Sequence, residues 1–304
     1  MSWEKKGLIF SPNKSMGWAI DSALTPTPIM INDLIRVYAG FRDRAGVSRI
    51  GYVDLDPSNP SIIINTSVKP ALNIGRPGCF DDNGVILGDI LFLDNRLYMY
   101  YVGFQLVKKV KFLAFTGLAV SDDDGESFIR VSDSPIMDRS GEGVYFRAIH
   151  SVIYEKGIWR CWYGVGSDWS TIKGKPYPSY NIRYAESNDG INFKNVGDEC
   201  FLFQGNEYRI GRPRVYKEHE IYKMHFTVGT LSGSYLPGFA ESVDGINWER
   251  NDSLAGLSPS SSGWDSKWVS YLAPIKVGNK EYVFYNGNNM GKEGFGYAER
   301  TIKE

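Results

Sequence analysis

Carboxylates, guanidinium groups and aromatic rings recur where successive repeats of this chain begin. Asp21, Asp82 and Glu207 supply carboxylates at three of these positions. Two carboxyl groups can cleave a glycosidic bond, because one protonates the leaving oxygen while the other activates water or attacks the sugar ring. Arginines and aromatic rings hold hydroxyl, carboxylate or phosphate groups and stack on sugar rings. The candidate substrate-binding residues are Arg147, His150, Arg209, Arg212, Trp268, Tyr271 and Trp169.

Structural roles account for the same residue types equally well, because acidic residues at strand entrances also cap turns and pair with arginines. Asp81 and Asp82 are adjacent and point to opposite sides of a strand, so either could face the site. Asp43, in a loop, and Asp89, within a strand, are weaker candidates. No His/Cys cluster has metal-ligand spacing and no glycine loop suits a phosphate cradle, so we expect no metal and no cofactor.

The elements that position these residues are set by an internal repeat. One short phrase returns five times, and a pair of mainly aromatic residues keeps step about fifteen residues ahead of it. Two series in step indicate one supersecondary unit stacked five times. The five phrases are Gly51-Tyr52-Val53, Gly117-Leu118-Ala119, Arg183-Tyr184-Ala185, Gly238-Phe239-Ala240 and Gly296-Tyr297-Ala298.

Each repeat is predicted to form four antiparallel strands, with hairpin turns at Asp124-Gly125, Asn188-Asp189-Gly190 and Asp244-Gly245. These turns resemble sialidase Asp-boxes but lack the residue between Asp and Gly, so we interpret them as structural. Radial repetition of four-stranded units predicts an all-β, five-bladed β-propeller forming one domain over residues 1–304. Residues 2–5 are expected to supply the outer strand of the fifth blade and so close the ring. Inner strands are expected at residues 25–31, 85–93, 148–154, 212–217 and 269–277.

Long connections are predicted on one face of this propeller only, and binding residues concentrate on loops held by a rigid scaffold. The opposite face carries tight turns such as Asn32-Asp33 and Asp94-Asn95. The function is therefore expected on the long-loop face. Its loops span residues 11–24, 71–84, 137–147, 204–211 and 254–267 between blades, and 104–115 and 166–180 within blades.

Composition argues against several classes of partner. The chain has 34 basic and 35 acidic residues, so neither nucleic acid nor an anionic membrane is expected. We interpret the basic segment Lys108-Lys109-Val110-Lys111 as a solvated loop. Three scattered cysteines (Cys79, Cys161 and Cys200) and the lack of a signal-peptide pattern predict a cytoplasmic protein with reduced thiols.

The five-blade pattern, with Asp21 before the first inner strand and Glu207 before the fourth, resembles the arabinanase, levansucrase and invertase superfamily. Glycoside hydrolase families 43, 32 and 130 belong to or neighbour that group. The phrases at residues 48–51, 184–190 and 285–288 are similar to uncharacterised "glucosyl hydrolase" proteins. The resemblance covers essentially the whole chain and implies a carbohydrate substrate.

By resemblance to family 43, Asp21 would be the general base and Glu207 the general acid of an inverting hydrolase. Asp82, or else Glu142, would tune the acid and orient the sugar. No Asp-Pro follows Asp21, and the invertase motifs are absent, which argues against a fructosidase. In the third repeat Arg147 and His150 stand where a carboxylate is expected, and they resemble the phosphate-binding side of family 130 phosphorylases.

Three alternatives to a hydrolase therefore stay open. The first is an inverting phosphorylase or an enzyme acting on a phosphorylated or nucleotide-linked sugar. The second is a carbohydrate-binding propeller without catalysis, and the third is a protein-interaction propeller.

Overall fold

The computed structural model describes residues 3–172 and 174–302, which are nearly all β-structure. Within these residues the only helical segments are a short 3₁₀ turn, η1 (Asp252–Ala255), and a short turn labelled α1 (Asn288–Gly291). No helix in the described part of the chain is long and apolar enough to cross a membrane.

Consecutive strands pair antiparallel in groups of four, called quartets below. The first contains β2 (Asp21–Ile31), β3 (Leu34–Arg42), β4 (Ser48–Leu55) and β5 (Ile63–Thr66). The second contains β6 (Val85–Leu93), β7 (Arg96–Gln105), β8 (Leu113–Ser121) and β9 (Ile129–Arg130). The third contains β10 (Phe146–Glu155), β11 (Ile158–Ile172), β12 (Lys175–Ser187) and β13 (Asp198–Glu199).

The fourth quartet contains β14 (Glu207–Glu218), β15 (Ile221–Thr230), β16 (Tyr235–Ser242) and β17 (Glu249–Arg250). The fifth contains β18 (Ser270–Val277), β19 (Lys280–Asn286) and β20 (Phe295–Thr301), and its outer strand is β1 (Glu4–Phe10). The N-terminal segment thus pairs with the C-terminal strand, as expected, although Ser2 lies outside the described residues.

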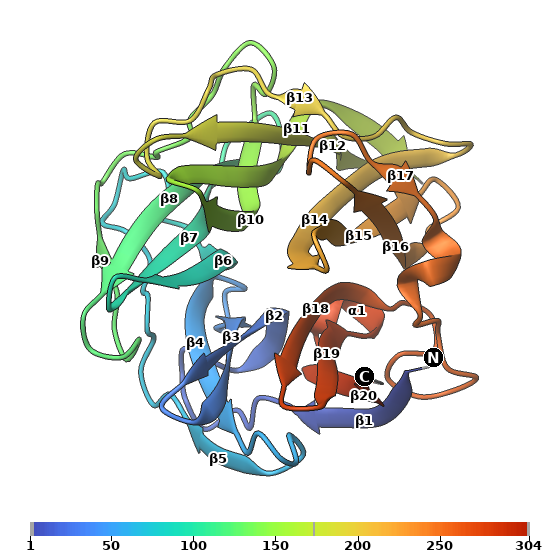
Figure 1. The fold of residues 1–304 in the computed structure, drawn as a ribbon. Coiled ribbons are helices and arrows are strands. Elements are labelled where there is room, and N and C mark those ends of the chain that lie inside the picture. The colour runs from blue at the N-terminus through green and yellow to red at the C-terminus, as the bar shows by residue number, and fades with distance from the viewer. Residues whose placement is uncertain (1–2, 173, 303–304) are drawn as a thin grey trace.

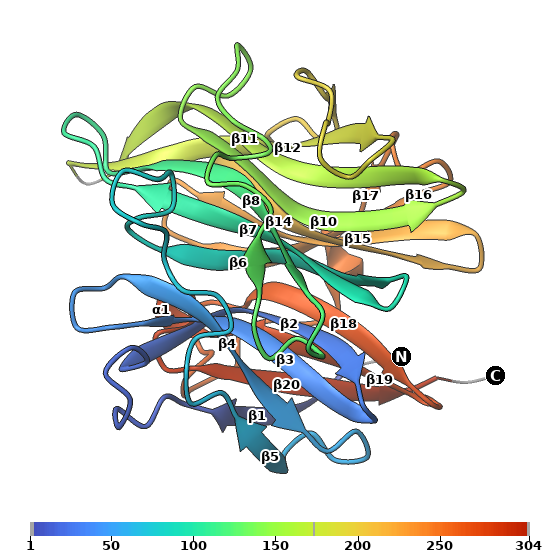
Figure 2. The same cartoon turned by 90° about the vertical axis from the view of Figure 1, so that its left-hand side faces the viewer.

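The quartets are arranged radially, with the first strand of each nearest the centre (Figure 1). Seen from the side, the first and fifth quartets lie at one end of the view and the third at the other (Figure 2). Short parallel contacts, β8 with β10 and β12 with β14, join the second, third and fourth quartets into one twelve-stranded sheet. Buried aliphatic and aromatic side chains fill the space between neighbouring quartets.

The tight turns predicted on one face are present. Asn32 and Asp33 both have positive φ, at 47° and 61°, as do Asp94 and Asn95, at 51° and 59°. Two consecutive left-handed residues give a hairpin the twist of its flanking strands, and Asn and Asp tolerate this conformation. These residues therefore fix the register of β2 with β3 and of β6 with β7.

The Asp-Gly turns join neighbouring quartets, so their structural interpretation agrees with the contacts. An aromatic residue in the second strand of each preceding quartet donates a hydrogen bond to the glycine carbonyl of the turn. The donors are Tyr38 to Gly125 (2.8 Å), Tyr100 to Gly190 (2.9 Å) and Trp162 to Gly245 (2.8 Å).

One of these turns differs from its prediction. In the second quartet the carboxylate that caps the turn is Asp123, which accepts bonds from Ser121 Oγ (2.6 Å) and the Ser127 amide (3.0 Å). One residue, Asp124, therefore separates the capping aspartate from Gly125, which is the Asp-box spacing. The other two turns lack that extra residue.

One connection also differs from its prediction. Residues 166–180, expected to be a loop, extend β11 and β12 as a paired hairpin out to Ile172 and Lys175. Alternating pairs such as Trp169 with Pro178 continue the ladder past a register shift between Val165 and Asp168. The long-loop face therefore carries a stiff two-stranded projection beside the centre.

Candidate functional site

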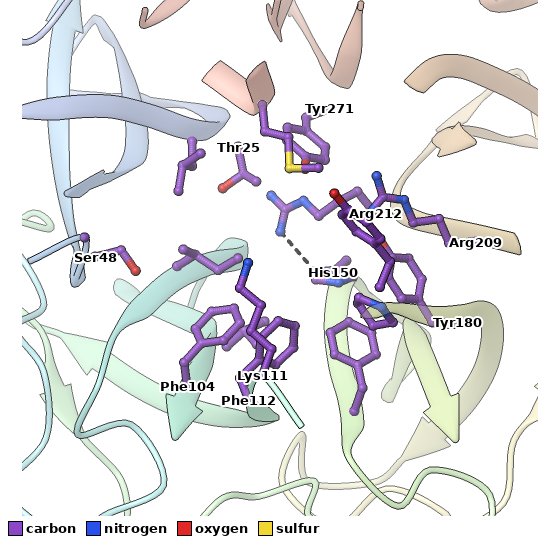
Figure 3. Close-up of a pocket in the computed structure, with 18 of the residues that line it drawn as sticks. Thr25, Ser48, Phe104, Lys111, Phe112, His150, Tyr180, Arg209, Arg212 and Tyr271 are labelled. Atoms are coloured by element: carbon purple, nitrogen blue, oxygen red, sulfur yellow. Dashed lines mark hydrogen bonds between the residues drawn. The ribbon is translucent and has the colours of Figure 1, made fainter. Parts of the chain in front are cut away.

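A pocket of about 360 Å³ lies where the first strands of the quartets approach one another. That size is within the range of small-molecule sites, about 300–1,000 Å³. Thr25, His150, Arg212 and Tyr271 reach it from four different quartets (Figure 3). The same quartets and the connecting segments also contribute Arg42, Ser48, Asn83, Lys111, Tyr180, Arg209, Tyr235 and Met290.

Irregularities in the inner strands place these side chains. The antiparallel register of each inner strand is interrupted at or next to one of five residues, and β2 and β14 each have a second shift nearer their start. The five residues are Thr25, Gly88, His150, Arg212 and Tyr271. A bulge leaves one residue unpaired and re-aims its side chain. Here four of the five bulge residues line the pocket. The fifth is Gly88, where a Cβ atom would lie 2.2 Å from the Ile149 carbonyl oxygen.

Three bulge residues have backbone conformations that side chains other than glycine rarely adopt. The φ angles of Thr25, Arg212 and Tyr271 are 55°, 54° and 62°. Such a conformation costs about 1–3 kcal/mol and is found mostly at functional sites. Polar side chains support this backbone: the Thr25 amide donates to Asn286 Oδ1 (2.8 Å) and the Tyr271 amide to Thr227 Oγ1 (3.0 Å).

Arg212 and His150 form the centre of the pocket. Arg212 Nη1 lies 3.0 Å from His150 Nδ1 and donates to the Leu87 carbonyl (2.5 Å). Burial, and then the nearby guanidinium, holds the pKa of His150 well below 6.5, so the imidazole is neutral. Burial also lowers the pKa of Arg212, to about 10. The guanidinium group is therefore still charged at neutral pH, and its charge destabilises the folded protein.

Arg209 is a second buried cation beside it. Its side chain stacks over the Tyr235 ring at 4.3 Å and the Tyr208 ring at 5.0 Å. Arg209 is only 7% exposed, and its buried Nε has no hydrogen-bond partner among the described residues. Burial raises the pKa of Tyr180 and of Tyr235, so both hydroxyl groups stay protonated and can donate.

No carboxylate lines this pocket in the part of the chain that the structure describes. The acidic group behind it, Asp89, is 2% exposed and fully engaged elsewhere. It accepts bonds from Arg214, from the Val152 amide (2.7 Å) and from the Ile90 amide (2.8 Å). The arrangement presents hydrogen-bond donors and positive charge to whatever enters.

The predicted catalytic carboxylates lie apart from the pocket lining. Asp21 opens β2 and accepts a bond from Ser22 Oγ (2.7 Å). It lines a separate, more open cavity of about 750 Å³ together with Lys14, Arg44 and Lys292. Asp82 accepts from the Gly78 amide (2.9 Å).

Glu207 is held in a two-point ion pair. Arg250 on β17 donates to its two oxygens at 2.6 and 3.0 Å, and both side chains are 9% exposed. The Gln204 amide donates to the same carboxylate (2.9 Å). Asp81, the neighbour of Asp82, is 0% exposed and pairs with Arg130 (2.7 Å). The structure therefore does not bring Asp21, Asp82 and Glu207 together in the central pocket.

Four of the seven predicted substrate-binding residues line the pocket: His150, Arg209, Arg212 and Tyr271. The other three, Arg147, Trp268 and Trp169, do not. Arg147 turns toward Glu142 (2.9 Å) and the Asp138 carbonyl (2.8 Å). Trp268 donates to the Gly233 carbonyl (3.1 Å). The ring of Trp169 packs on Tyr145 at 4.9 Å and on Phe112, which itself lines the pocket, at 5.6 Å.

Several residues that line the pocket were not predicted from the sequence. Lys111 belongs to the basic segment interpreted as a solvated loop; it is exposed and lies in a loop, as expected, and it also lines the pocket. A lysine followed by an aromatic residue within a predicted long loop was the available signal. Arg42 and Tyr235 lie at strand ends that nothing in the sequence marks.

Comparison with known proteins gives two full-length relatives from Mycobacterium tuberculosis strains and several similar folds. No protein-family model matches the chain. The "Uncharacterized protein Rv1502" of Mycobacterium tuberculosis is 30% identical over 300 residues, covering 98% of this chain and 99% of the relative. A solved structure named "Glycoside hydrolase" has a TM-score of 0.76 at 19% identity, covering 100% of this chain and 93% of its own.

A second solved structure comes from work described as "The GH130 family of mannoside phosphorylases contains glycoside hydrolases that target beta-1,2 mannosidic linkages in Candida mannan". It has a TM-score of 0.72 at 14% identity, and covers 99% of this chain and 94% of its own. The fold is thus that of the glycosidase superfamily which the sequence resembles.

Proposed function

The chain belongs to the family of the Mycobacterium tuberculosis protein Rv1502, and we propose that it is a glycoside-active protein whose central pocket binds a sugar derivative carrying an anionic group. This proposal favours two of the alternatives over a simple hydrolase: an enzyme that acts on a phosphorylated or nucleotide-linked sugar, and an inverting phosphorylase. Because one fold can support many activities, the proposal rests on the residues of the pocket.

We propose that the five quartets are the blades of one propeller domain over residues 1–304, closed where β1 pairs with β20. The pairing of Glu4 with Glu299 and of Leu8 with Gly296 supports this closure. In such a ring the pocket lies on the axis, and four of the five blades contribute a bulge residue to it.

The observation that carries the functional proposal is a pair of guanidinium groups in the pocket, Arg209 buried and Arg212 partly buried, without a carboxylate partner among the described residues. Arg209 and Arg212 line the pocket and form no ion pair with any described residue. A charge taken out of water is stabilised by an opposite charge and by hydrogen bonds. An anionic ligand would supply both, since phosphate and carboxylate oxygens accept two parallel bonds from a guanidinium group.

The other polar groups suit the same ligand. His150 is neutral, and the hydroxyl groups of Tyr180, Tyr235 and Tyr271 are protonated, because burial shifts the pKa of each against its charged form. Neutral donors around two cations favour an anion or the hydroxyl groups of a sugar. They disfavour a cationic ligand.

The catalytic assignment stays a separate prediction: Asp21 as base, Glu207 as acid and Asp82 as the tuning carboxylate. None of the three lines the central pocket, so their chemistry would have to occur at its rim or in the neighbouring cavity beside Asp21. A carbohydrate-binding protein without catalysis needs only the pocket. The two possibilities therefore differ in whether these carboxylates matter.

Calorimetric titration with glucose, glucose 1-phosphate, a nucleotide sugar and inorganic phosphate tests the binding site. We expect the phosphorylated ligands to bind at least tenfold more tightly than glucose, and Arg209→Gln to remove that difference. Equal affinity for glucose and glucose 1-phosphate would refute the anionic site.

A turnover screen with and without phosphate then tests the reaction. Loss of turnover in Asp21→Asn and Glu207→Gln, with ligand affinity kept, would support the catalytic pair. Full ligand affinity with no turnover in any condition would favour the binding protein.

A further inference from the structure

The central pocket has two chemically different sides. Arg209, Arg212, Tyr235 and Tyr271 come from the fourth and fifth quartets and form the cationic side. The facing side comes mainly from the second quartet and is mainly apolar, although Lys111 lies beside Phe104 and Phe112 (Figure 3). Its lining residues are Leu24, Ile86, Val102, Phe104, Leu106, Phe112 and Phe146. Figure 3 shows Phe104 and Phe112 across the pocket from Arg209 and Tyr180.

The apolar side is a packed wall. The Phe104 and Phe112 rings meet edge to face at 5.3 Å, and Trp169 supports Phe112 from behind. Together with Ile86 and Phe104 they pack on the buried cluster around Val102. A wall braced in this way is preformed, so a ligand need not order it on binding.

The wall continues out of the pocket along the loop at residues 106–112, which joins β7 to β8. Leu106 lines the pocket and is 63% exposed, and Val107 beside it is 36% exposed. Lys111 lines the pocket from the same loop. An exposed apolar strip that begins inside a ligand site is a surface for a ligand to cover.

We infer that the ligand of this pocket is an anionic amphiphile: a phosphate or diphosphate ester, bearing the sugar, joined to a hydrocarbon chain. The anion binds Arg209 and Arg212, and the chain lies on the wall of Ile86, Phe104 and Phe112 and leaves along Leu106. This inference rests on the proposed anionic site and adds the identity of the group on the other side of the phosphate.

Pocket volume agrees with such a ligand. About 360 Å³ is near the lower end of the range for ligand sites. It holds an anionic head group with the first part of a chain, so a longer chain has to leave the pocket. The exposed side chains of Leu106 and Val107 lie on the loop that carries the wall outward.

A nucleoside is the main competing group, and the wall does not suit it. A nucleobase carries ring nitrogens and exocyclic groups that lose hydrogen bonds when placed against aliphatic side chains. Leu24, Ile86, Val102 and Leu106 offer none. A hydrocarbon chain has no such groups, and each methylene that it buries contributes favourably.

Titration with inorganic phosphate and with ethyl, butyl and hexyl phosphate tests the inference by calorimetry. We expect affinity to rise by up to about fourfold for each added methylene that reaches the wall. The matching alkyl alcohols, which lack the anion, should bind far more weakly. A nucleoside monophosphate should bind no more tightly than ethyl phosphate.

Variants separate the two halves of the site. Leu106→Ser and Phe112→Ser should flatten the dependence on chain length while leaving the affinity for inorganic phosphate unchanged. Arg212→Gln should weaken every phosphate by a similar factor. Leu254→Ser is the matched control, because Leu254 is 53% exposed and lies outside the pocket.

The outcomes distinguish this inference from the proposed function. If phosphates bind but affinity does not change with chain length, or if Leu254→Ser changes the series as much as Leu106→Ser, the amphiphile is wrong and the anionic site stands. If no phosphate binds at all, the proposed anionic site fails and this inference fails with it.

Discussion

Replacing Arg212 by methionine should make the unliganded protein more stable, although it removes a central residue of the pocket. Methionine matches the length of the arginine stem and keeps the same Cβ, so the unusual backbone at this position is unchanged. What the substitution removes is a positive charge that no carboxylate of the described residues contacts, although the charge of Asp89 acts on it from a distance.

The size of the effect follows from the pKa of Arg212. Burial lowers it from 12.5 to about 10, which corresponds to about 3 kcal/mol against folding at neutral pH. Loss of the bonds to the Leu87 carbonyl and His150 offsets part of this, about 1–2 kcal/mol. We therefore expect Arg212→Met to raise the free energy of unfolding by about 1–2 kcal/mol.

Arg36→Met is the control for a buried arginine that does have a partner. Arg36 binds both oxygens of Asp54, at 2.7 and 2.9 Å, and the two side chains are 7% and 3% exposed. Removing one member of a buried pair leaves the other charge uncompensated, so this variant should lose about 3–5 kcal/mol.

Urea unfolding followed by tryptophan fluorescence at pH 7 measures both variants. A saturating anionic ligand, at about 100 times its Kd, should then stabilise the wild type by about 2.7 kcal/mol and Arg212→Met by much less. The reasoning is refuted if Arg212→Met loses stability as Arg36→Met does, because the charge of Arg212 would then already be compensated without a ligand.

Three further predictions concern stability. Burial lowers the pKa of His225 from 6.5 to about 3. Only the unfolded chain therefore takes up this proton as the pH falls below about 6.5, which favours unfolding. In urea titrations the free energy of unfolding of the wild type should fall by about 2 kcal/mol more than that of His225→Phe between pH 7 and pH 5. Gly88→Ala places a Cβ 2.2 Å from the Ile149 carbonyl oxygen and should cost about 3 kcal/mol, seen as a lower Tm; an unchanged Tm would mean that the two strands can separate there. Glu207→Gln breaks a largely buried ion pair with Arg250 and should lower the free energy of unfolding by about 2–3 kcal/mol. Asp252 is a 40% exposed partner of the same arginine, so Asp252→Asn should lower it by less than about 1 kcal/mol. Equal losses would contradict a structural role for Glu207.

The pairing of the strands could be predicted because short sequence patterns for turns and strands recur in each repeat. Two-residue turns such as Asn32-Asp33 specify where strands reverse, and a regular aromatic pattern marks the second and third strands. The extended hairpin of β11 and β12 was missed because its sequence from Gly166 to Tyr180 contains lysines, prolines and glycine that are typical of loops. Pairing across the hairpin, together with the packing of Trp169 on Tyr145, overrides that preference.

The site could be predicted only in part, because the residues that line the pocket are not the ones at the beginning of the inner strands. Asp21 and Glu207 open their strands, as expected, but the pocket is lined further along, where the ladder is interrupted. Bulges carry little sequence signal: Thr25, Arg212 and Tyr271 have left-handed backbones without being glycine or asparagine. The register shifts that place them arise from contacts between quartets that a single repeat does not contain.

The pairing of β1 with β20 has a consequence for how the protein is made. On a ribosome the strand Glu4–Phe10 leaves the tunnel before the other described strands, and its partner Phe295–Thr301 leaves after them. Because translation takes about 5–20 residues per second, the earliest strand waits many seconds with an open hydrogen-bonding edge, while the four intervening quartets can fold in order. The fifth quartet is therefore completed only after the strands of the other four have left the ribosome, and the edge of β1 is open to wrong partners until then.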